Sequence, residues 1–136
     1  MKNIHLLPTE KPSYLYKMSD GKLYLSNLFE KGNSAWVNQH IYITNDEKPK
    51  SCDWCFNPKT NKIVKVGHHG HYGYSSKKII LTTDQDLIAD GVQAIDDEFL
   101  EWFVKNPSCE FVEVQDWVNY YKVFIPQEEP KQSVQE

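Results

Sequence analysis

The chain has 136 residues, 40% of them hydrophobic and 13% aromatic, and a formal net charge of −4. This composition is too apolar for a disordered chain, and no apolar run approaches the roughly 20 residues that a membrane span needs. All 15 basic residues are lysines. Because arginine is the usual side chain for bidentate contacts to guanine or phosphate, its absence disfavours sequence-specific nucleic-acid recognition.

The N-terminal segment and the cysteines bear on the compartment. Residues 1–13 contain no continuous apolar stretch, because Pro8, Glu10 and Lys11 interrupt it, so no secretory signal is predicted. Three cysteines in such a chain indicate reduced thiols rather than a disulfide framework. We therefore expect a protein of the cytoplasm that has no membrane partner.

Two segments of the chain carry opposite charge. Residues 48–78 contain seven lysines and one acid, a local balance of +6. Residues 84–101 contain seven acids and no base, a local balance of −7. Complementary patches of this kind favour docking to another protein or self-association.

Alternating apolar and polar residues predict strands through the first half of the chain. The pair Asp20-Gly21 suits a hairpin turn between the first two of these strands. The turn-forming cluster 57–62 separates another two, which predicts a second hairpin. The strands predicted here are residues 13–17, 23–26, 35–44, 54–56 and 63–66.

The segment 77–114 carries boundary signals at almost every joint between its elements. Residues 78–82 are apolar and rich in β-branched side chains, which predicts a central strand. Thr83 or Asp84 can cap a short helical turn after this strand, and Gly91 can leave that turn in the left-handed conformation.

A longer helix is predicted over residues 97–106. Asp96 or Asp97 can cap this helix, and Pro107 ends it, because the residue before a proline is disfavoured in the helical conformation. Two further alternating segments, residues 109–114 and 120–125, are predicted strands.

These elements predict one α+β domain over residues 1–126. Its sheet should be small and mostly antiparallel, either curled or closed into a partly open β-barrel, with about seven strands and one main helix at 97–106. Residues 127–136 are almost entirely polar and are expected to form a flexible tail.

A cysteine pair followed by a histidine-rich stretch suggests a metal site. Cys52 and Cys55, together with His68 and His71, could supply the two thiolates and two imidazoles of a tetrahedral zinc site. The histidine spacing is tighter than usual, and a chain of this size does not need zinc to fold. No cofactor is therefore the first expectation, with zinc at these four residues as the alternative; a redox pair is disfavoured because no helix follows Cys55.

Other chemical motifs are weak. Asp84, Asp86 and Asp90 do not match a calcium-binding loop, and capping or solvation explains them more simply. The common phosphate-binding and hydrolase motifs are absent from the sequence. We therefore expect no enzyme activity; a hydrolase would require an acid, a histidine and a nucleophile to be brought together in space.

The lysine-rich segment 48–78 offers an alternative function, since lysine contacts and aromatic stacking can bind single-stranded nucleic acid without sequence preference. If the lysines are solvated and the aromatic side chains point inward, the same pattern is structural. The residues proposed for nucleic-acid binding are Lys59, Lys62, Lys65, Trp54, Tyr72 and Tyr74.

Three parts of the chain carry a family resemblance: MKNIHLLPTEKPSYLY at 1–16, IYITNDE at 41–47 followed by Asp53-Trp54, and the segment 77–114. Together they resemble uncharacterised small proteins encoded by tailed bacteriophages and prophages of Bacteroidetes-type hosts. The resemblance implies an accessory protein in the host cytoplasm or in the virion, and it implies no activity. The first expectation is thus a non-enzymatic phage protein that contacts a phage protein, a host protein or a second copy of itself.

Overall fold

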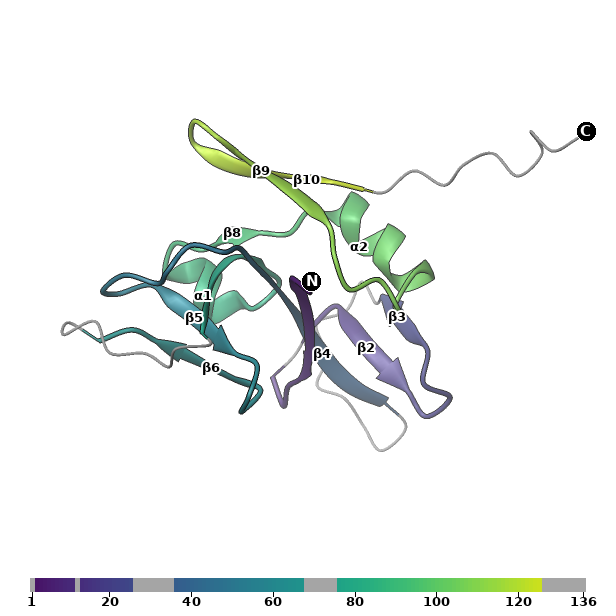
Figure 1. The fold of residues 1–136 in the computed structure, drawn as a ribbon. Coiled ribbons are helices and arrows are strands. Elements are labelled where there is room, and N and C mark those ends of the chain that lie inside the picture. The colour runs from purple at the N-terminus through teal and green to yellow at the C-terminus, as the bar shows by residue number, and fades with distance from the viewer. Residues whose placement is uncertain (1, 12, 26–35, 68–75, 126–136) are drawn as a thin grey trace, which may run out of the picture.

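The computed structural model describes residues 2–11, 13–25, 36–67 and 76–125, and Figure 1 shows their arrangement. Within these ranges the chain forms ten strands and two short helices, neither of them long and apolar enough to cross a membrane. Eight strands form one sheet: β1 (Ile4–Pro8), β2 (Leu15–Met18), β3 (Leu23–Leu25), β4 (Trp36–Thr44), β5 (Trp54–Asn57), β6 (Lys62–Lys65), β7 (Lys77–Thr82) and β8 (Gln93–Ala94). The helices are α1 (Gln85–Ala89) and α2 (Asp97–Lys105), and the last two strands are β9 (Glu113–Trp117) and β10 (Tyr120–Phe124).

The predicted antiparallel sheet is confirmed, but a barrel is not. The path β3-β2-β4-β7-β5-β6 has two ends that do not pair with each other, and β1 and β8 branch from it onto β4 and β7. Only the β7–β8 pair is parallel among the described strands. With ten strands and two short helices, the described chain is mainly β, so the expectation of about seven strands and one main helix was only partly right.

β4 is the strand around which the sheet is built. It is nine residues long and pairs with β1, β2 and β7, so it joins the two N-terminal strands to β7. The predicted hairpins β2–β3 and β5–β6 are both present. Gly21 has a φ of 85° in the first of their turns, which is the conformation that the Asp-Gly pair predicted.

Two strands were not predicted. β1 lies in a short apolar stretch that shows no clear alternation, and its pairing with β4 from Ile4↔Ile43 to Pro8↔Gln39 is what makes it a strand. β8 has only two residues, Gln93 and Ala94, which is too short for any alternation to show. Both strands are therefore set by tertiary pairing rather than by local pattern.

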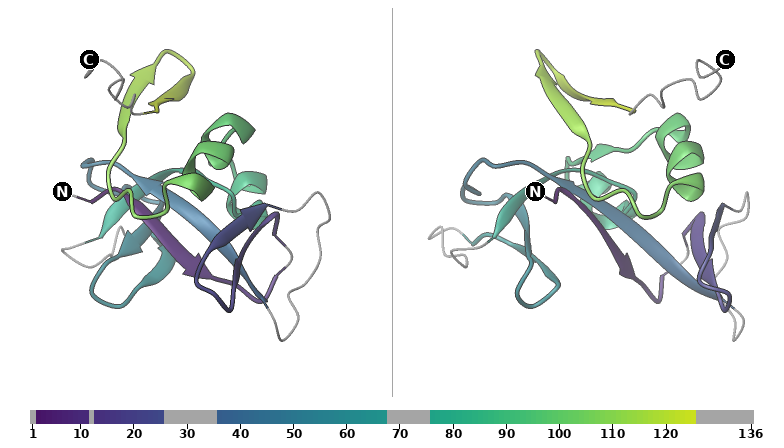
Figure 2. Two further views of the ribbon diagram at one scale, coloured as in Figure 1. Left: turned by 90° about the vertical axis from the view of Figure 1, so that its right-hand side faces the viewer. Right: turned by 45° about the vertical axis from the view of Figure 1, so that its right-hand side comes forward.

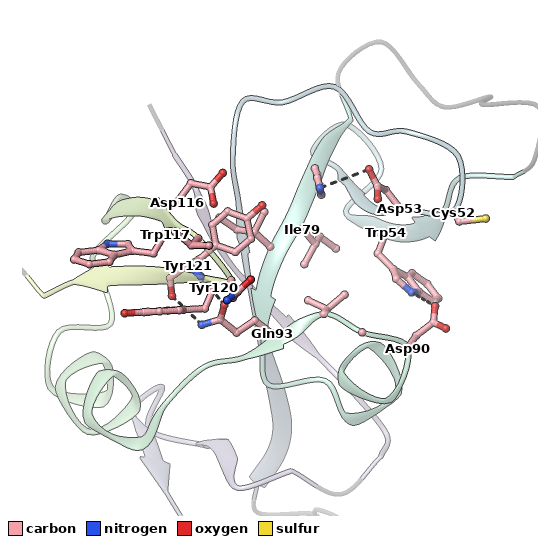
Figure 3. Close-up of a pocket in the computed structure, with 16 residues that line it drawn as sticks. Cys52, Asp53, Trp54, Ile79, Asp90, Gln93, Asp116, Trp117, Tyr120 and Tyr121 are labelled. Atoms are coloured by element: carbon pink, nitrogen blue, oxygen red, sulfur yellow. Dashed lines mark hydrogen bonds and ion pairs between the residues drawn. The ribbon is translucent and has the colours of Figure 1, made fainter.

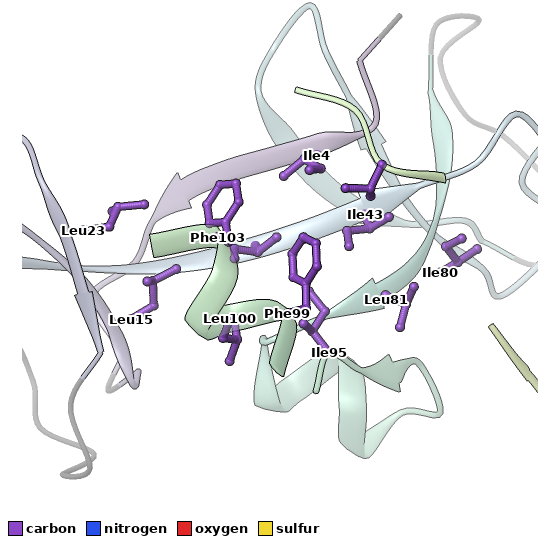
Figure 4. Packing of buried hydrophobic residues seen from close by; sticks show 12 residues of the cluster. Ile4, Leu15, Leu23, Ile43, Ile80, Leu81, Ile95, Phe99, Leu100 and Phe103 are labelled. Atoms are coloured by element: carbon purple, nitrogen blue, oxygen red, sulfur yellow. The ribbon is translucent and has the colours of Figure 1, made fainter. Parts of the chain in front are cut away.

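Both helices begin at predicted caps. The Asp84 carboxylate accepts a hydrogen bond from the Asp86 N–H at the start of α1, and the Asp96 carboxylate accepts one from the Phe99 N–H at the start of α2. Gly91 follows α1 with a φ of 105°. The apolar face of α2 covers the sheet, as Figure 4 shows.

The main hydrophobic core lies between α2 and the sheet (Figure 4). A smaller buried cluster lies under α1 and contains Tyr42, Phe56, Ile79 and Leu87. The buried residues of the main core come from α2, from the segments that flank it and from strands β1, β2, β3, β4 and β7: Ile4, Leu15, Leu23, Ile41, Ile43, Ile80, Leu81, Ile95, Phe99, Leu100, Phe103 and Val112.

The β9–β10 hairpin stands away from the sheet in the views of Figures 1 and 2. Its first strand was predicted at 109–114 but begins at Glu113. The side-chain amide of Asn3 explains the difference, because it donates to the Val112 C=O at 2.8 Å and accepts from the Val112 N–H at 2.9 Å. A side chain thus takes the place of a neighbouring strand at Val112, and strand pairing starts only after it.

Candidate functional site

A groove of about 420 Å³ separates the β9–β10 hairpin from the sheet, and Figure 3 shows it from close by. Its apolar lining includes Ile79 of β7 and Val92. Trp54 and Asp90 lie on one wall, and residues of the hairpin form the other. Several aromatic side chains around a concave surface with a few polar groups are typical of a binding site.

The wall next to β5 is a compact polar contact. The indole Nε1 of Trp54 donates to Asp90 Oδ2 at 2.8 Å, and Lys65 Nζ lies 2.7 Å from the same oxygen. The Lys65 ammonium also lies 5.9 Å from the centre of the Trp54 ring. The hydrogen bond from Lys65, and then that from Trp54, lowers the pKa of Asp90, so this carboxylate is held in its charged form.

The opposite wall is tied to the sheet through Gln93. Its side-chain amide donates to the Tyr121 C=O at 2.8 Å and accepts from the Tyr121 N–H at 2.7 Å. Asn3 makes the same double contact with Val112, just before β9. Two side-chain amides, together with the packing of Val114, Tyr121 and Val123 against the main core, therefore hold the hairpin to the rest of the molecule. Because a two-stranded hairpin is marginally stable on its own, these contacts should set its position.

Replacing Gln93 with alanine should loosen the hairpin. The Tyr121 N–H would lose its hydrogen-bond partner on Gln93. Its hydrogen–deuterium exchange should become at least about tenfold faster, because the variant loses two hydrogen bonds and each contributes about 1 kcal/mol net. Exchange of core amides in β4 should stay unchanged. If Tyr121 exchanged at the same rate in both proteins, Gln93 would not be what holds the hairpin.

The tip of the hairpin exposes large apolar side chains. Trp117 is 44% exposed and Tyr120 is 50% exposed, and Val118 between them is almost fully exposed. The rings of Trp117 and Tyr120 stack with centroids 6.0 Å apart, and the Lys122 ammonium lies 5.3 Å from the centre of the Trp117 ring. Exposed tryptophan and tyrosine on a projecting element are the side chains that most often dominate protein interfaces.

The opposite charges of the two sequence segments are partly compensated within the molecule. Lys65 of the basic segment pairs with Asp90 of the acidic one, so the two segments meet in a single chain. Lys77 lies 3.0 Å from Asp46, and Lys78 lies 3.8 Å from Asp53. The net charge of each segment is thus a poor guide to the surface potential.

The acidic residues Asp84, Asp86 and Asp90 all have structural contacts. Asp84 caps α1 and accepts from the Tyr42 hydroxyl at 2.6 Å. Asp86 pairs with Lys11, and Asp90 pairs with Lys65. Capping accounts for Asp84, as predicted, and exposed ion pairs that the sequence did not predict account for Asp86 and Asp90.

The structure describes two of the four predicted zinc ligands, Cys52 and Cys55. Cys55 is fully buried in β5, and burial raises the pKa of its thiol, whereas Cys52 is exposed. His68 and His71 lie outside the described residues. No group of three or more metal-ligating side chains forms within the ranges that the structure covers. The four-residue zinc site stays a prediction.

The nucleic-acid residues are spread over the β5–β6 hairpin. Lys59 and Lys62 are exposed near its turn, while Lys65 and Trp54 converge on Asp90. Tyr72 and Tyr74 lie outside the described residues. Within the described part, the Lys65 ammonium and the Trp54 indole N–H proposed for nucleic-acid binding are therefore both engaged by Asp90.

One cluster combines a histidine, a hydroxyl and an acid. His40 Nδ1 lies 3.1 Å from Thr83 Oγ1, and Asp84 follows directly. His40 is buried, Thr83 also accepts from the Ile41 N–H at 3.0 Å, and Asp84 is engaged by Tyr42. These contacts join β4 to the end of β7, and a buried imidazole has no access to a substrate. The cluster is therefore explained by the fold.

Comparison with protein-family models, with curated proteins and with solved structures finds no match to this chain. The groove must therefore be interpreted from its own residues. Sequence reasoning missed most of the hairpin side of it, although a signal was present: the segment 116–121 places three aromatic residues around a Val-Asn turn. The role of Gln93 has no sequence signal, because any exposed strand residue could be glutamine.

Proposed function

We propose that the protein is a non-enzymatic interaction protein that binds a partner protein through the β9–β10 hairpin and the groove beside it. The observation that carries this proposal is the exposed aromatic tip, Trp117 and Tyr120, on a hairpin that projects from the sheet. In a soluble monomer such side chains cost free energy in water, and burying them in an interface recovers it. The sequence resemblance supports a tailed-phage setting, with a phage or host protein as partner.

The neighbouring groove supports the same function. Its lining includes Trp117, Tyr120 and Tyr121 of the hairpin and Trp54 of β5. Aromatic anchors beside a pocket with a polar rim are the usual arrangement of an interface hot spot. A partner side chain inserted here would be desolvated next to the exposed rings.

Single-stranded nucleic-acid binding remains the alternative. The exposed Lys59 and Lys62 favour it. Against it, Lys65, Lys77 and Lys78 are paired with aspartates, and Asp116 on the hairpin wall of the aromatic groove has no lysine partner among the described residues. A phosphate backbone would be repelled from the surface where stacking rings are available.

Trp117→Ala should abolish recovery of the partner. In affinity purification from phage-infected host cells, a hot-spot tryptophan is expected to be worth at least about 2 kcal/mol, or roughly 30-fold in affinity. Tyr24→Ala is the matched control, because Tyr24 is 38% exposed on β3 and does not line the groove. The proposal fails if both variants recover the same proteins as the unmodified chain, or if nucleic acid is recovered in place of a protein.

A further inference from the structure

The charge of the groove defines which kind of partner it can accept. Its lining includes three carboxylates, Asp53, Asp90 and Asp116, and one ammonium, that of Lys78. Lys78 lies 3.8 Å from Asp53, and Lys65 neutralises Asp90 from outside the groove. Among the described residues no lysine is paired with Asp116. Asp116 therefore leaves negative charge on the hairpin wall, while the Lys78 ammonium on the sheet wall acts electrostatically on Tyr121.

The sheet wall shows how this protein holds a lysine side chain. At Trp54 and Asp90, the Lys65 ammonium contacts both a carboxylate oxygen, at 2.7 Å, and the face of an indole, 5.9 Å from its centre. The hydrogen bond to Asp90 raises the pKa of Lys65, as expected for an ammonium stabilised in its charged form. An aromatic ring beside a carboxylate thus already contacts an ammonium group within this chain.

The hairpin wall repeats the same pair of groups. Asp116 of β9 and Tyr121 of β10 are direct cross-strand partners, and both line the groove. Partners in an antiparallel pair place their side chains on one face of the hairpin, about 5 Å apart at Cβ. An aromatic ring and a carboxylate therefore stand side by side again, and Figure 3 shows them across the groove from Trp54 and Asp90.

We propose that the groove binds a peptide segment of the partner that carries a lysine or arginine side chain, with the cationic group at Asp116 and Tyr121. This inference rests on the proposed function and specifies the chemistry of the partner. The partly exposed Val92 of the lining would pack against the aliphatic stem of such a side chain. Acidic segments and phosphate backbones would be repelled by the Asp116 carboxylate on the hairpin wall.

The test uses three synthetic peptides, acetyl-Thr-Xaa-Thr-Xaa-Thr-amide, in which Xaa is lysine, glutamine or glutamate. Binding is followed by NMR at the indole N–H of Trp54 and the backbone amide of Tyr121. The lysine peptide should cause saturable shifts at both groups. The glutamine peptide should bind at least about tenfold more weakly, and the glutamate peptide should bind least, because only the cation gains the carboxylate and ring contacts.

Variants make this test specific. Asp116→Asn should weaken binding of the lysine peptide about tenfold, since it removes the charge and keeps the shape. Glu101→Gln, the same change at an exposed position of α2 that does not line the groove, should leave binding unchanged. Any of four results would overturn the inference. The lysine and glutamine peptides could bind equally well, or the Asp116→Asn variant could bind the lysine peptide as tightly as the unmodified protein. No peptide could cause a saturable shift, or free spermidine could bind as tightly as the lysine peptide. If one of these results appeared while the Trp117→Ala variant still failed to recover its partner, the inference of a basic peptide segment would be wrong and the proposed function would stand.

Discussion

Phe99→Ala should lower the free energy of unfolding by about 3–5 kcal/mol, the usual cost of removing a buried phenylalanine ring. Phe99 is 1% exposed on the face of α2 that packs on the sheet, and its ring lies 5.9 Å from that of Phe103 and 5.7 Å from that of Trp102. Removing it would leave a cavity between α2 and the strands that the surrounding core cannot fill. Such a loss is a large part of the 5–15 kcal/mol that stabilises a typical domain, by a rough general estimate.

The chain offers a matched control for this prediction. Phe111→Ala removes the same ring from a position that is 47% exposed, so its effect should stay below about 1 kcal/mol. Urea denaturation followed by tryptophan fluorescence measures both. If the two variants lost the same stability, the packing of α2 on the sheet would not be the main source of stability.

Acid should destabilise the protein through His5. This imidazole is buried, stacked on Phe56 with ring centroids 4.0 Å apart, and 3.2 Å from Thr44 Oγ1. Burial, followed by the charges of Lys2 and Lys77, lowers the pKa of His5 from 6.5 to about 4. The unfolded chain therefore binds a proton at His5 below pH 6.5, whereas the folded chain binds it only below about pH 4.

The stabilising effect of neutral His5 is thus fully present above pH 6.5 and is lost as the pH falls from 6.5 to 4. Since one pKa unit corresponds to about 1.4 kcal/mol, the loss attributable to His5 is on the order of 3 kcal/mol. Burial also lowers the pKa of His40, which adds to the loss in the same direction.

His5→Gln separates this effect from all other titrations. The variant should be less stable at pH 7, because it loses the ring contact with Phe56, but its stability should fall less steeply between pH 6.5 and 4. Urea denaturation at half-unit pH steps measures the difference in slope. A variant with the same pH dependence as the unmodified protein would show that His5 does not titrate in this range.

Local signals were enough to predict the elements whose ends are chemically marked. Asp84 and Asp96 cap helices where an acceptor side chain precedes an apolar run, and Gly21 and Gly91 adopt the positive φ that glycine tolerates. In each case the residue type limits the backbone within two or three positions. Such limits do not depend on the rest of the fold.

The parts that could not be predicted depend on contacts between distant residues. β1 is a strand because β4 lies beside it, and β9 starts late because Asn3, 109 positions earlier than Val112, occupies the backbone groups of that residue. The charge balances of segments 48–78 and 84–101 predict two separate patches, whereas Lys65 and Asp90 bring the two segments into contact in the structure. The candidate groove was missed for the same reason, since its walls come from β5, β7, β8 and the last hairpin.

The most direct test of the proposed function is site-specific photo-crosslinking at the hairpin tip. In phage-infected host cells, the setting proposed above, a benzoylphenylalanine at position 117 should form covalent adducts with one or a few partner proteins, because this side chain is expected to be buried in the interface. The same group at position 24 should form none of these adducts. Identical adducts from both positions, adducts to nucleic acid, or none from position 117 would contradict a partner-binding role for the β9–β10 hairpin.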